Sequence, residues 1–160
     1  MTPRHGGSYE FAAIDEATRY RVLKIYEHNR THLAVDFIED LRQRFPGAIQ
    51  RIQTDHGSEF GTDVRWHLHD LGIPHRSIPR RCPESSGKVK RSHRTDAEEC
   101  SRRVTFTSLA ELRAKLRQWD AEYNQERPHL ALKGATPANG SASSGSRVPQ
   151  VSGGRVDLHT

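Results

Sequence analysis

Residues 49–60 read IQRIQTDHGSEF, and this stretch decides the fold class. Ile49 to Thr54 has the composition of a short strand, and the DHGS that follows is typical of a loop. Asp55 is therefore expected where a strand ends, which is where functional groups gather in open α/β sheets. A carboxylate is a ligand that a hard cation such as Mg²⁺ prefers, but Asp also caps turns. The residues alone leave both roles of Asp55 open.

Strands and helices alternate on both sides of this stretch, which predicts an α/β fold. Thr31 is expected to be the N-cap of the first helix, and Pro128 lies just beyond the last one. The apolar spacing predicts strands at residues 9–14, 20–26, 49–54 and 73–78. It predicts helices at residues 31–45, 64–71, 85–103 and from 109 to a point before Pro128.

The length of 160 residues suits one domain, and the hydrophobic content of 33% implies a modest core. Residues 1–8 are polar and Gly-rich, and residues 139–160 are dominated by Gly, Ser, Ala and Val. We expect a disordered start at 1–8, a core domain at 9–138 and a disordered Gly/Ser-rich tail at 139–160.

Charge and cysteine usage narrow the expected partner and compartment. Lys and Arg number 25 against 20 Asp and Glu, which favours a polyanionic partner, although solvated charge is the common alternative. The two cysteines form no CxxC pair, which indicates a reducing cytoplasm. No apolar run is long enough to span a membrane, and the first residues lack the pattern of a signal peptide. We expect a cytoplasmic protein without a membrane partner.

A basic cluster lies between Arg80 and Arg94, with Glu84 as its one acid. On a helix, Lys90 and Arg94 share a face, and a helix start itself favours phosphate groups. A solvated charged face is the alternative. The residues expected to contact DNA are Arg80, Arg81, Lys88, Lys90, Arg91 and Arg94.

Three motifs in this order resemble the core of bacterial insertion-sequence transposases with the retroviral-integrase fold. TDHGSEF at 54–60 resembles the family's TDNGSEF, and CPESSGKVKRSHRT at 82–95 resembles CPESNGKVERSHRT. YNQERPHLALKGATP at 123–137, by itself a helix end and a packed turn, resembles the closing YN-x-x-RPH-x-AL-x-x-x-TP. The resemblance runs from about Tyr9 to Ala138. It implies an RNase H-like mixed sheet flanked by helices, and DNA cutting and joining with Mg²⁺ or Mn²⁺ held by an Asp, Asp, Glu triad.

The triad that the resemblance implies transfers only in part. Asp55 matches the second Asp, as a catalytic residue and metal ligand, whereas Lys90 stands where the family has its Glu. Asp15 and Glu84 are tempting replacements, but each matches a position that is not catalytic in the family. The first Asp lies in the family on a strand before the AIDEATRY hairpin, and MTPRHGGS stands there instead.

That first strand is central in an RNase H-like sheet, between the second strand and the strand that ends at Asp55. Residues 1–8 contain a Pro and two Gly and no alternating apolar residues, so they cannot fill this position. We expect an empty central slot with unpaired strand edges. The isolated chain is expected to be poorly stable, to aggregate, or to recruit a strand from a partner.

Three functions follow from these residues. The main one is a DNA transposase or integrase core that is catalytically impaired, a remnant of an insertion sequence. The first alternative is an active enzyme that uses Asp15, Asp55 and Glu84. The second is a non-enzymatic module that binds DNA or pairs with intact transposase subunits. Pairing with a second copy of the chain is open.

Overall fold

A computed structural model describes residues 8–15, 17–55, 57–78, 107–128, 132–139 and 148–156 of the chain. Its strands are β1 (Ser8–Asp15), β2 (Arg21–Tyr26), β3 (Ile52–Thr54), β4 (His75–Ser77) and β5 (Pro149–Val156). Its helices are α1 (Thr31–Arg44), the short 3₁₀ helix η1 (Ser58–Phe60), α2 (Thr62–Asp70) and α4 (Leu109–Glu126). In this part of the chain no helix is long and apolar enough to cross a membrane.

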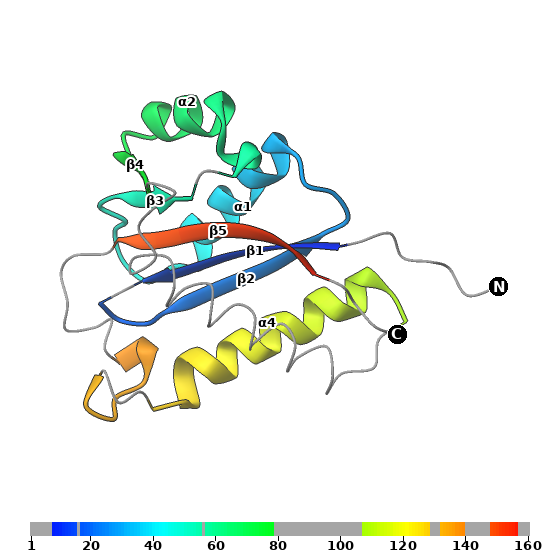
Figure 1. Cartoon of the computed structure of the whole chain (residues 1–160). Helices are drawn as coiled ribbons and strands as arrows, with labels where there is room; N and C mark the ends of the chain where they lie inside the picture. The colour runs from blue at the N-terminus through cyan, green and yellow to red at the C-terminus, as the bar shows by residue number, and fades with distance from the viewer. Residues whose placement is uncertain are drawn as a thin grey trace.

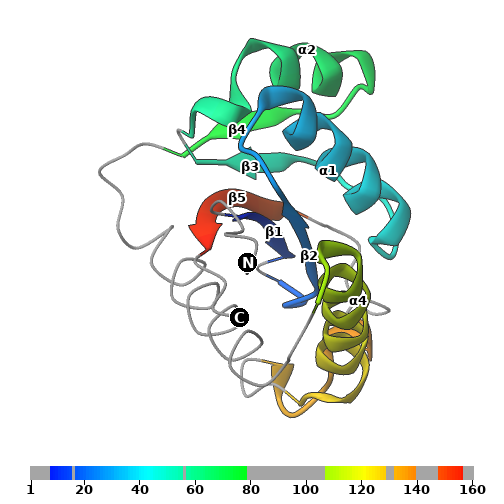
Figure 2. The same cartoon turned by 90° about the vertical axis from the view of Figure 1, so that its right-hand side faces the viewer.

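The strands form one mixed sheet in the order β2-β1-β5-β3-β4. β1 is antiparallel to both β2 and β5, whereas β3 is parallel to both β5 and β4. Figure 1 shows β5, in red, between β1 and β3 although it comes from the end of the chain. Helices α1 and α2 lie on one side of the sheet and α4 on the other (Figure 2). The sheet is therefore flanked by helices, as the sequence predicts.

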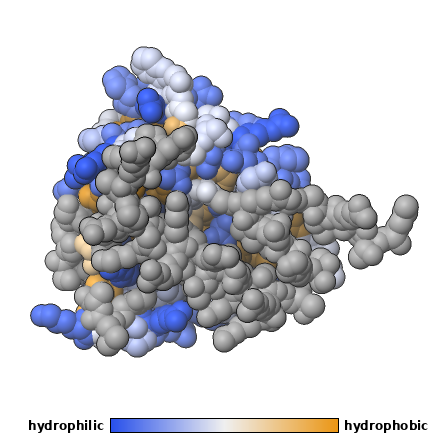
Figure 3. Space-filling view, in the orientation of Figure 1, coloured by the Kyte–Doolittle hydropathy of each residue, from blue (hydrophilic) through white to orange (hydrophobic). Residues whose placement is uncertain are grey.

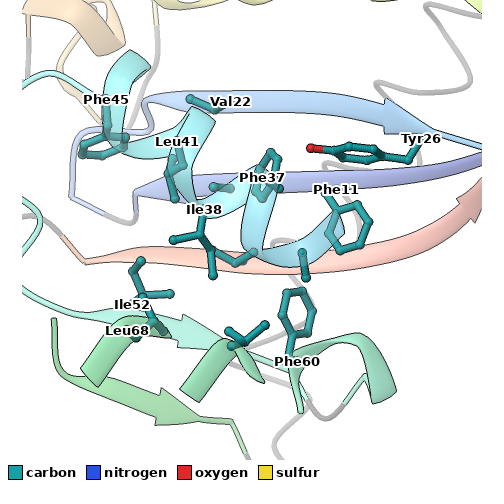
Figure 4. Packing of buried hydrophobic residues seen from close by; sticks show 14 residues of the cluster. Phe11, Val22, Tyr26, Phe37, Ile38, Leu41, Phe45, Ile52, Phe60 and Leu68 are labelled. Carbon is teal, nitrogen blue, oxygen red and sulfur yellow. The ribbon is translucent and has the colours of Figure 1, made fainter. Parts of the chain in front are cut away.

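Alternation along the strands divides the core between the two faces. The face toward α1 and α2 carries the larger cluster. At its middle the ring centre of Phe11 lies 5.7 Å from that of Phe37 and 6.0 Å from that of Phe60 (Figure 4). On the other face Ile25 packs against Leu112 and Leu116 of α4. Each fully buried side chain of this size contributes about 1.5–3 kcal/mol. The described surface in the view of Figure 3 is mostly hydrophilic.

The hairpin and the helices confirm most of the predicted elements. β1 and β2 pair from Tyr9↔Tyr26 to Ile14↔Arg21. The predicted N-cap is one residue late, because α1 has Arg30 in that position. α4 begins with a capping box, in which Ser108 Oγ accepts from the N–H of Glu111 while the Glu111 carboxylate accepts from Thr107. α4 ends before Pro128, as predicted. The predicted helix at 85–103 lies outside the described residues.

Two expectations about the sheet are wrong. Residues 149–156 form β5, so this part of the predicted disordered tail is ordered, while residues 140–147 and 157–160 lie outside the described residues. The central slot is filled, because β5 pairs with the whole of β1 and with the end of β3. Residues 149–156, PQVSGGRV, have poor intrinsic strand propensity, so local sequence did not reveal the strand. The unpaired edges of β1 and β3 supply the hydrogen bonds that stabilise it.

The ends of the predicted core domain shift accordingly. Ser8, expected to belong to a disordered start, is the first residue of β1, and residues 1–7 lie outside the described part of the chain. The sheet includes a strand from beyond residue 138, so the fold extends past the domain boundary that composition indicated.

Candidate catalytic face at the carboxyl end of β3

Asp55 directly follows β3 at its carboxyl end, as the sequence predicts. Its side chain is half-buried, and its Oδ1 accepts a hydrogen bond from the N–H of Gly57 at 3.0 Å. This contact is the turn-capping role that the residues left open. The position at a strand end also suits a metal ligand, so the place of Asp55 in the fold is compatible with both roles.

The register between β3 and β5 leads from Asp55 toward Ser152 on the central strand. The parallel pairing of β3 with β5 aligns Gln53 with Gln150 and Thr54 with Val151, and the next residues along are Asp55 and Ser152. Gln150 Nε2 donates to Gln53 Oε1 at 3.4 Å, so these side chains share a face. Continuing this register by one residue aligns Asp55, which follows the strand, with Ser152. The residue of the central strand at that level has a neutral hydroxyl.

A buried carboxylate, Glu59, lies beside the same loop, and sequence reasoning missed it. Glu59 is 5% exposed and its Oε2 accepts from Asn29 Nδ2 at 3.3 Å. Its carboxylate also fills the space where a Cβ would stand on two glycines, with Oε1 2.5 Å from that position at Gly57 and 2.6 Å at Gly153. The TDHGSEF motif contains Glu59, but only the fold brings Gly153 to it.

Asp15 lies away from this face. It is 1% exposed, and its Oδ2 accepts from the N–H and the hydroxyl of Thr18 at 3.0 and 2.6 Å. Its Oδ1 accepts from the N–H of Val148 at 3.0 Å, so it also fixes the entry to β5. Asp15 pairs with Pro149, three residues before Ser152, which is about 10 Å along a strand. Its side chain stabilises the hairpin turn and the start of β5.

The last sequence motif contributes to structure through α4. Asn124 accepts from the N–H of Arg21 at 2.9 Å and donates to its carbonyl at 2.7 Å. The Arg21 guanidinium lies 3.8 Å from the ring centre of Tyr123, and its Nε donates to Asp120 at 3.1 Å. Burial raises the pKa of the Asp120 carboxyl, while the charges of Arg21 and Arg44 and the N–H of Leu23 oppose that rise. These motif residues join α4 to β2.

The outer edge of β2 is therefore closed by side chains. Asp120 accepts from the N–H of Leu23 at 2.7 Å, and Arg44 donates to the carbonyl of Leu23 at 3.1 Å. Arg113 donates to the carbonyl of Ile25 at 2.8 Å. With the two bonds of Asn124, these contacts occupy the groups through which another strand would pair.

The described residues around Asp55 do not fit a two-metal centre. Such a centre needs several carboxylates that hold two cations about 3.5–4 Å apart. Asp55 offers one carboxylate and Ser152 a neutral hydroxyl, and the described residues contain no group of three or more His, Cys, Asp or Glu that could hold a metal ion. The expected DNA-contacting residues, Arg80 to Arg94, and Glu84 among them, lie outside the described part of the chain.

The fold that carries this face is known from integrases. The catalytic core domain of BIV integrase superposes on it with a TM-score of 0.64 at 20% identity, covering 81% of this chain and 82% of that domain. The mixed five-strand sheet flanked by helices is thus an RNase H-like fold of the integrase-core class. Integrase-type folds generally use divalent metals.

Sequence comparisons agree with the fold. Residues 71–137 match the family model described as integrase core domain. A protein of Spiroplasma virus SpV1-C74, named as an integrase (ORF3), is 31% identical over 82% of this chain and 41% of its own length. An uncharacterized protein of insertion element IS407 from Burkholderia multivorans is 28% identical over 78% of this chain and 46% of its own. Over residues 71–137 the chain is similar to the integrase core domain family, and it spans less than half the length of these relatives.

Proposed function

We propose that this chain is a DNA transposase or integrase core that binds DNA but does not cut or join it. The observation that carries the proposal is that two of the three expected carboxylates are replaced. The register between β3 and β5 leads from Asp55 to Ser152 on the central strand, and Lys90 stands in the sequence motif where the resemblance implies a Glu. Of the Asp, Asp, Glu triad that the resemblance implies, Asp55 is the one carboxylate that remains.

Charge and coordination chemistry explain why these two replacements matter. A Lys ammonium has donors only and cannot ligate a cation. At about 4 Å and an effective dielectric near 20, a like unit charge costs roughly 4 kcal/mol, which weakens cation binding by about three orders of magnitude. A Ser hydroxyl is neutral and brings no charge to offset a divalent ion. Mg²⁺ or Mn²⁺ is therefore expected to bind weakly, and no reaction step is assigned to it.

The alternative of an active enzyme built on Asp15, Asp55 and Glu84 has less support. Both carboxylate oxygens of Asp15 accept hydrogen bonds from the turn and from Val148. Asp15 also pairs with Pro149, three residues and about 10 Å along β5 from Ser152. Carboxylates separated by such a distance do not share two metal ions that lie about 3.5–4 Å apart.

DNA is the proposed partner, and the cytoplasm is the proposed compartment. The net charge is +5 at pH 7, and the basic segment from Arg80 to Arg94 carries the residues proposed to contact phosphates. A chain that binds DNA without cutting it also fits a module that pairs with intact transposase subunits on their DNA.

A strand-transfer assay with Mg²⁺ or Mn²⁺ tests the catalytic part of the proposal. We expect no nicking or joining by the unmodified chain, by Lys90→Glu or by Ser152→Asp. The double variant should bind Mn²⁺ measurably more tightly in calorimetry, because two carboxylates are added beside Asp55, and Asp55→Asn in that background should abolish the gain. Metal-dependent nicking by the unmodified chain that Asp55→Asn removes would overturn the proposal.

DNA binding is tested separately by its dependence on salt. Each neutralised phosphate contributes a slope of about −0.9 in log K against log salt. We expect a steep slope for duplex DNA that becomes less steep in the double variant Arg80→Ala/Arg81→Ala. The control Glu122→Gln, at an exposed position of α4, should leave the slope unchanged. Affinity that stays flat with salt would contradict a role on DNA.

A further inference from the structure

The strand at the centre of the sheet is the last of the described strands in sequence order. Among the described strands, β5 is the one that joins the β1–β2 hairpin to the β3–β4 pair through backbone hydrogen bonds. Its first contact links the N–H of Val148 to Asp15, 133 residues away in the sequence. Until β5 arrives, β1 and β3 present two unpaired edges that face the same slot.

The slot selects its occupant at one position. Gly153 pairs with Phe11, and a Cβ on Gly153 would stand 2.6 Å from Glu59 Oε1 and 3.3 Å from Phe11 Cε1. Glu59 is buried, and its carboxylate accepts a hydrogen bond from Asn29, so both restrict its movement away from Gly153. An extended segment with a side chain at this level therefore requires the Glu59 carboxylate to shift, whereas the segment VSGGR fits without that shift.

Further positions fit the same segment. Val151 is 1% exposed and belongs to the cluster formed with Phe11 and Ile52. Gln150 donates to Gln53 across the β3 boundary, and Val148 donates to Asp15. A second copy of this chain carries all of these residues in the same order, so its β5 satisfies every contact equally.

The strand is also held in a way that permits exchange. Its pairing with β3 covers only Gln53 and Thr54. Gly153 and Gly154 lie within it, and Gly in a strand costs about 0.5–1 kcal/mol relative to Ala.

We propose that the central slot accepts β5 from a second copy of the chain, which gives a strand-exchanged dimer. Exchange keeps the same contacts in both slots, and such swapping is a low-cost route to dimers. The candidate face is then shared, with Asp55 from one copy beside Ser152 from the other. The inference holds whether or not the chain acts on DNA.

Concentration decides how much exchange occurs. A segment tethered within its own chain competes at an effective concentration on the order of 1 mM. Exchange is therefore minor at about 10 µM and substantial near about 1 mM, a rise of at least about tenfold.

Cysteine pairing between separate copies tests the proposal. Ala12 and Ser152 are direct partners in the β1–β5 register, at a separation that a disulfide spans. In a background with Cys82→Ser and Cys100→Ser, chains with Ala12→Cys are mixed with chains with Ser152→Cys and oxidised. Their mixed disulfide forms only when the β5 of one copy lies in the slot of the other. Chains with Glu122→Cys, an exposed position on α4, replace the Ser152→Cys partner as the control.

We expect the Ala12→Cys with Ser152→Cys product to rise at least tenfold between the two concentrations and to exceed the Glu122→Cys control. The double variant in one chain should close internally at low concentration. If it closes internally and no mixed product forms at any concentration, β5 stays in its own slot and the proposal fails. Light scattering of the unmodified chain is independent of the cysteines, and a strict monomer near about 1 mM would also overturn it.

Discussion

At the outer edge of the sheet, β2 gives its backbone groups to side chains of α1 and α4. At the centre, β1 and β3 give theirs to the backbone of β5. The edge uses Asp120, Asn124 and Arg44, each with a short charged or amide contact to β2. The centre uses a segment with two adjacent glycines and, among its described side chains, the buried apolar Val151.

The difference separates two ways of completing a sheet. Side chains that close an edge must be particular residues at particular positions. Part of the edge is therefore encoded in a sequence motif, the one that begins with Tyr123 and Asn124. A strand that fills a gap needs mainly an extended backbone and one small residue. The centre therefore depends on the shape of the slot, which Glu59 and Gly57 define.

Removing the centre should have the largest effect. Truncation after Val148 deletes β5 and leaves two edges without partners, and each lost bond costs about 0.5–1.5 kcal/mol against a total stability of about 5–15 kcal/mol. We expect the cooperative thermal transition in circular dichroism to disappear, and a peptide of residues 148–160 to restore it. Truncation after Val156 is the matched control and should melt like the full chain. An unchanged melt after truncation at Val148 would show that β5 does not hold the sheet together.

Breaking the edge should have the next largest effect. Asp120→Ala leaves the Arg21 guanidinium buried without its carboxylate, and such losses cost about 3–5 kcal/mol. The measurement is the free energy of unfolding in urea. Arg42→Ala, which removes an exposed ion pair with Glu39, should cost less than about 1 kcal/mol. Equal costs for the two variants would mean that the Arg21–Asp120 ion pair contributes no more than an exposed one.

Adding a single methyl group at Gly153 tests whether Glu59 restricts what can occupy the central slot. Gly153→Ala places a carbon against the Glu59 carboxylate, and overpacking of this kind costs about 1–3 kcal/mol. Ser152→Ala adds no atom and therefore causes no overpacking. In a double-mutant cycle, Glu59→Ala should reduce the cost of Gly153→Ala, because the clash is removed. Additive costs would show that Glu59 does not select glycine.

The smallest expected effect concerns β4, the opposite edge. His75 Nε2 lies 2.7 Å from Thr54 Oγ1, and burial, aided by the charge of Arg65, lowers the pKa of His75. The unfolded chain takes up this proton near pH 6.5, whereas the folded chain resists it. Stability from His75 is therefore present above about pH 6.5 and declines as the pH falls below it. Urea midpoints at two pH values should move less in His75→Gln, and an identical shift in both proteins would refute this role.

Much of the fold was predictable because local patterns carried it. Phe37, Ile38 and Leu41 recur at helical spacing in α1, and the β1–β2 hairpin alternates as a two-sided strand pair does. Asp55 at a strand end followed from the same reasoning. The pairing of Asp120 with Arg21 did not, because an ion pair between residues so far apart has no local signal.

The sequence by itself determined the resemblance to integrase cores, through motifs whose residue types stand at fixed spacing, and it predicted that Lys90 occupies the position where that resemblance implies a Glu. Only the tertiary structure decided the role of residues 149–156 and the neighbour of Asp55. A segment of low strand propensity becomes a strand when two unpaired edges and a buried carboxylate offer it a slot of its own shape. That environment exists only after β1, β3 and Glu59 are in place, so no window of sequence contains it.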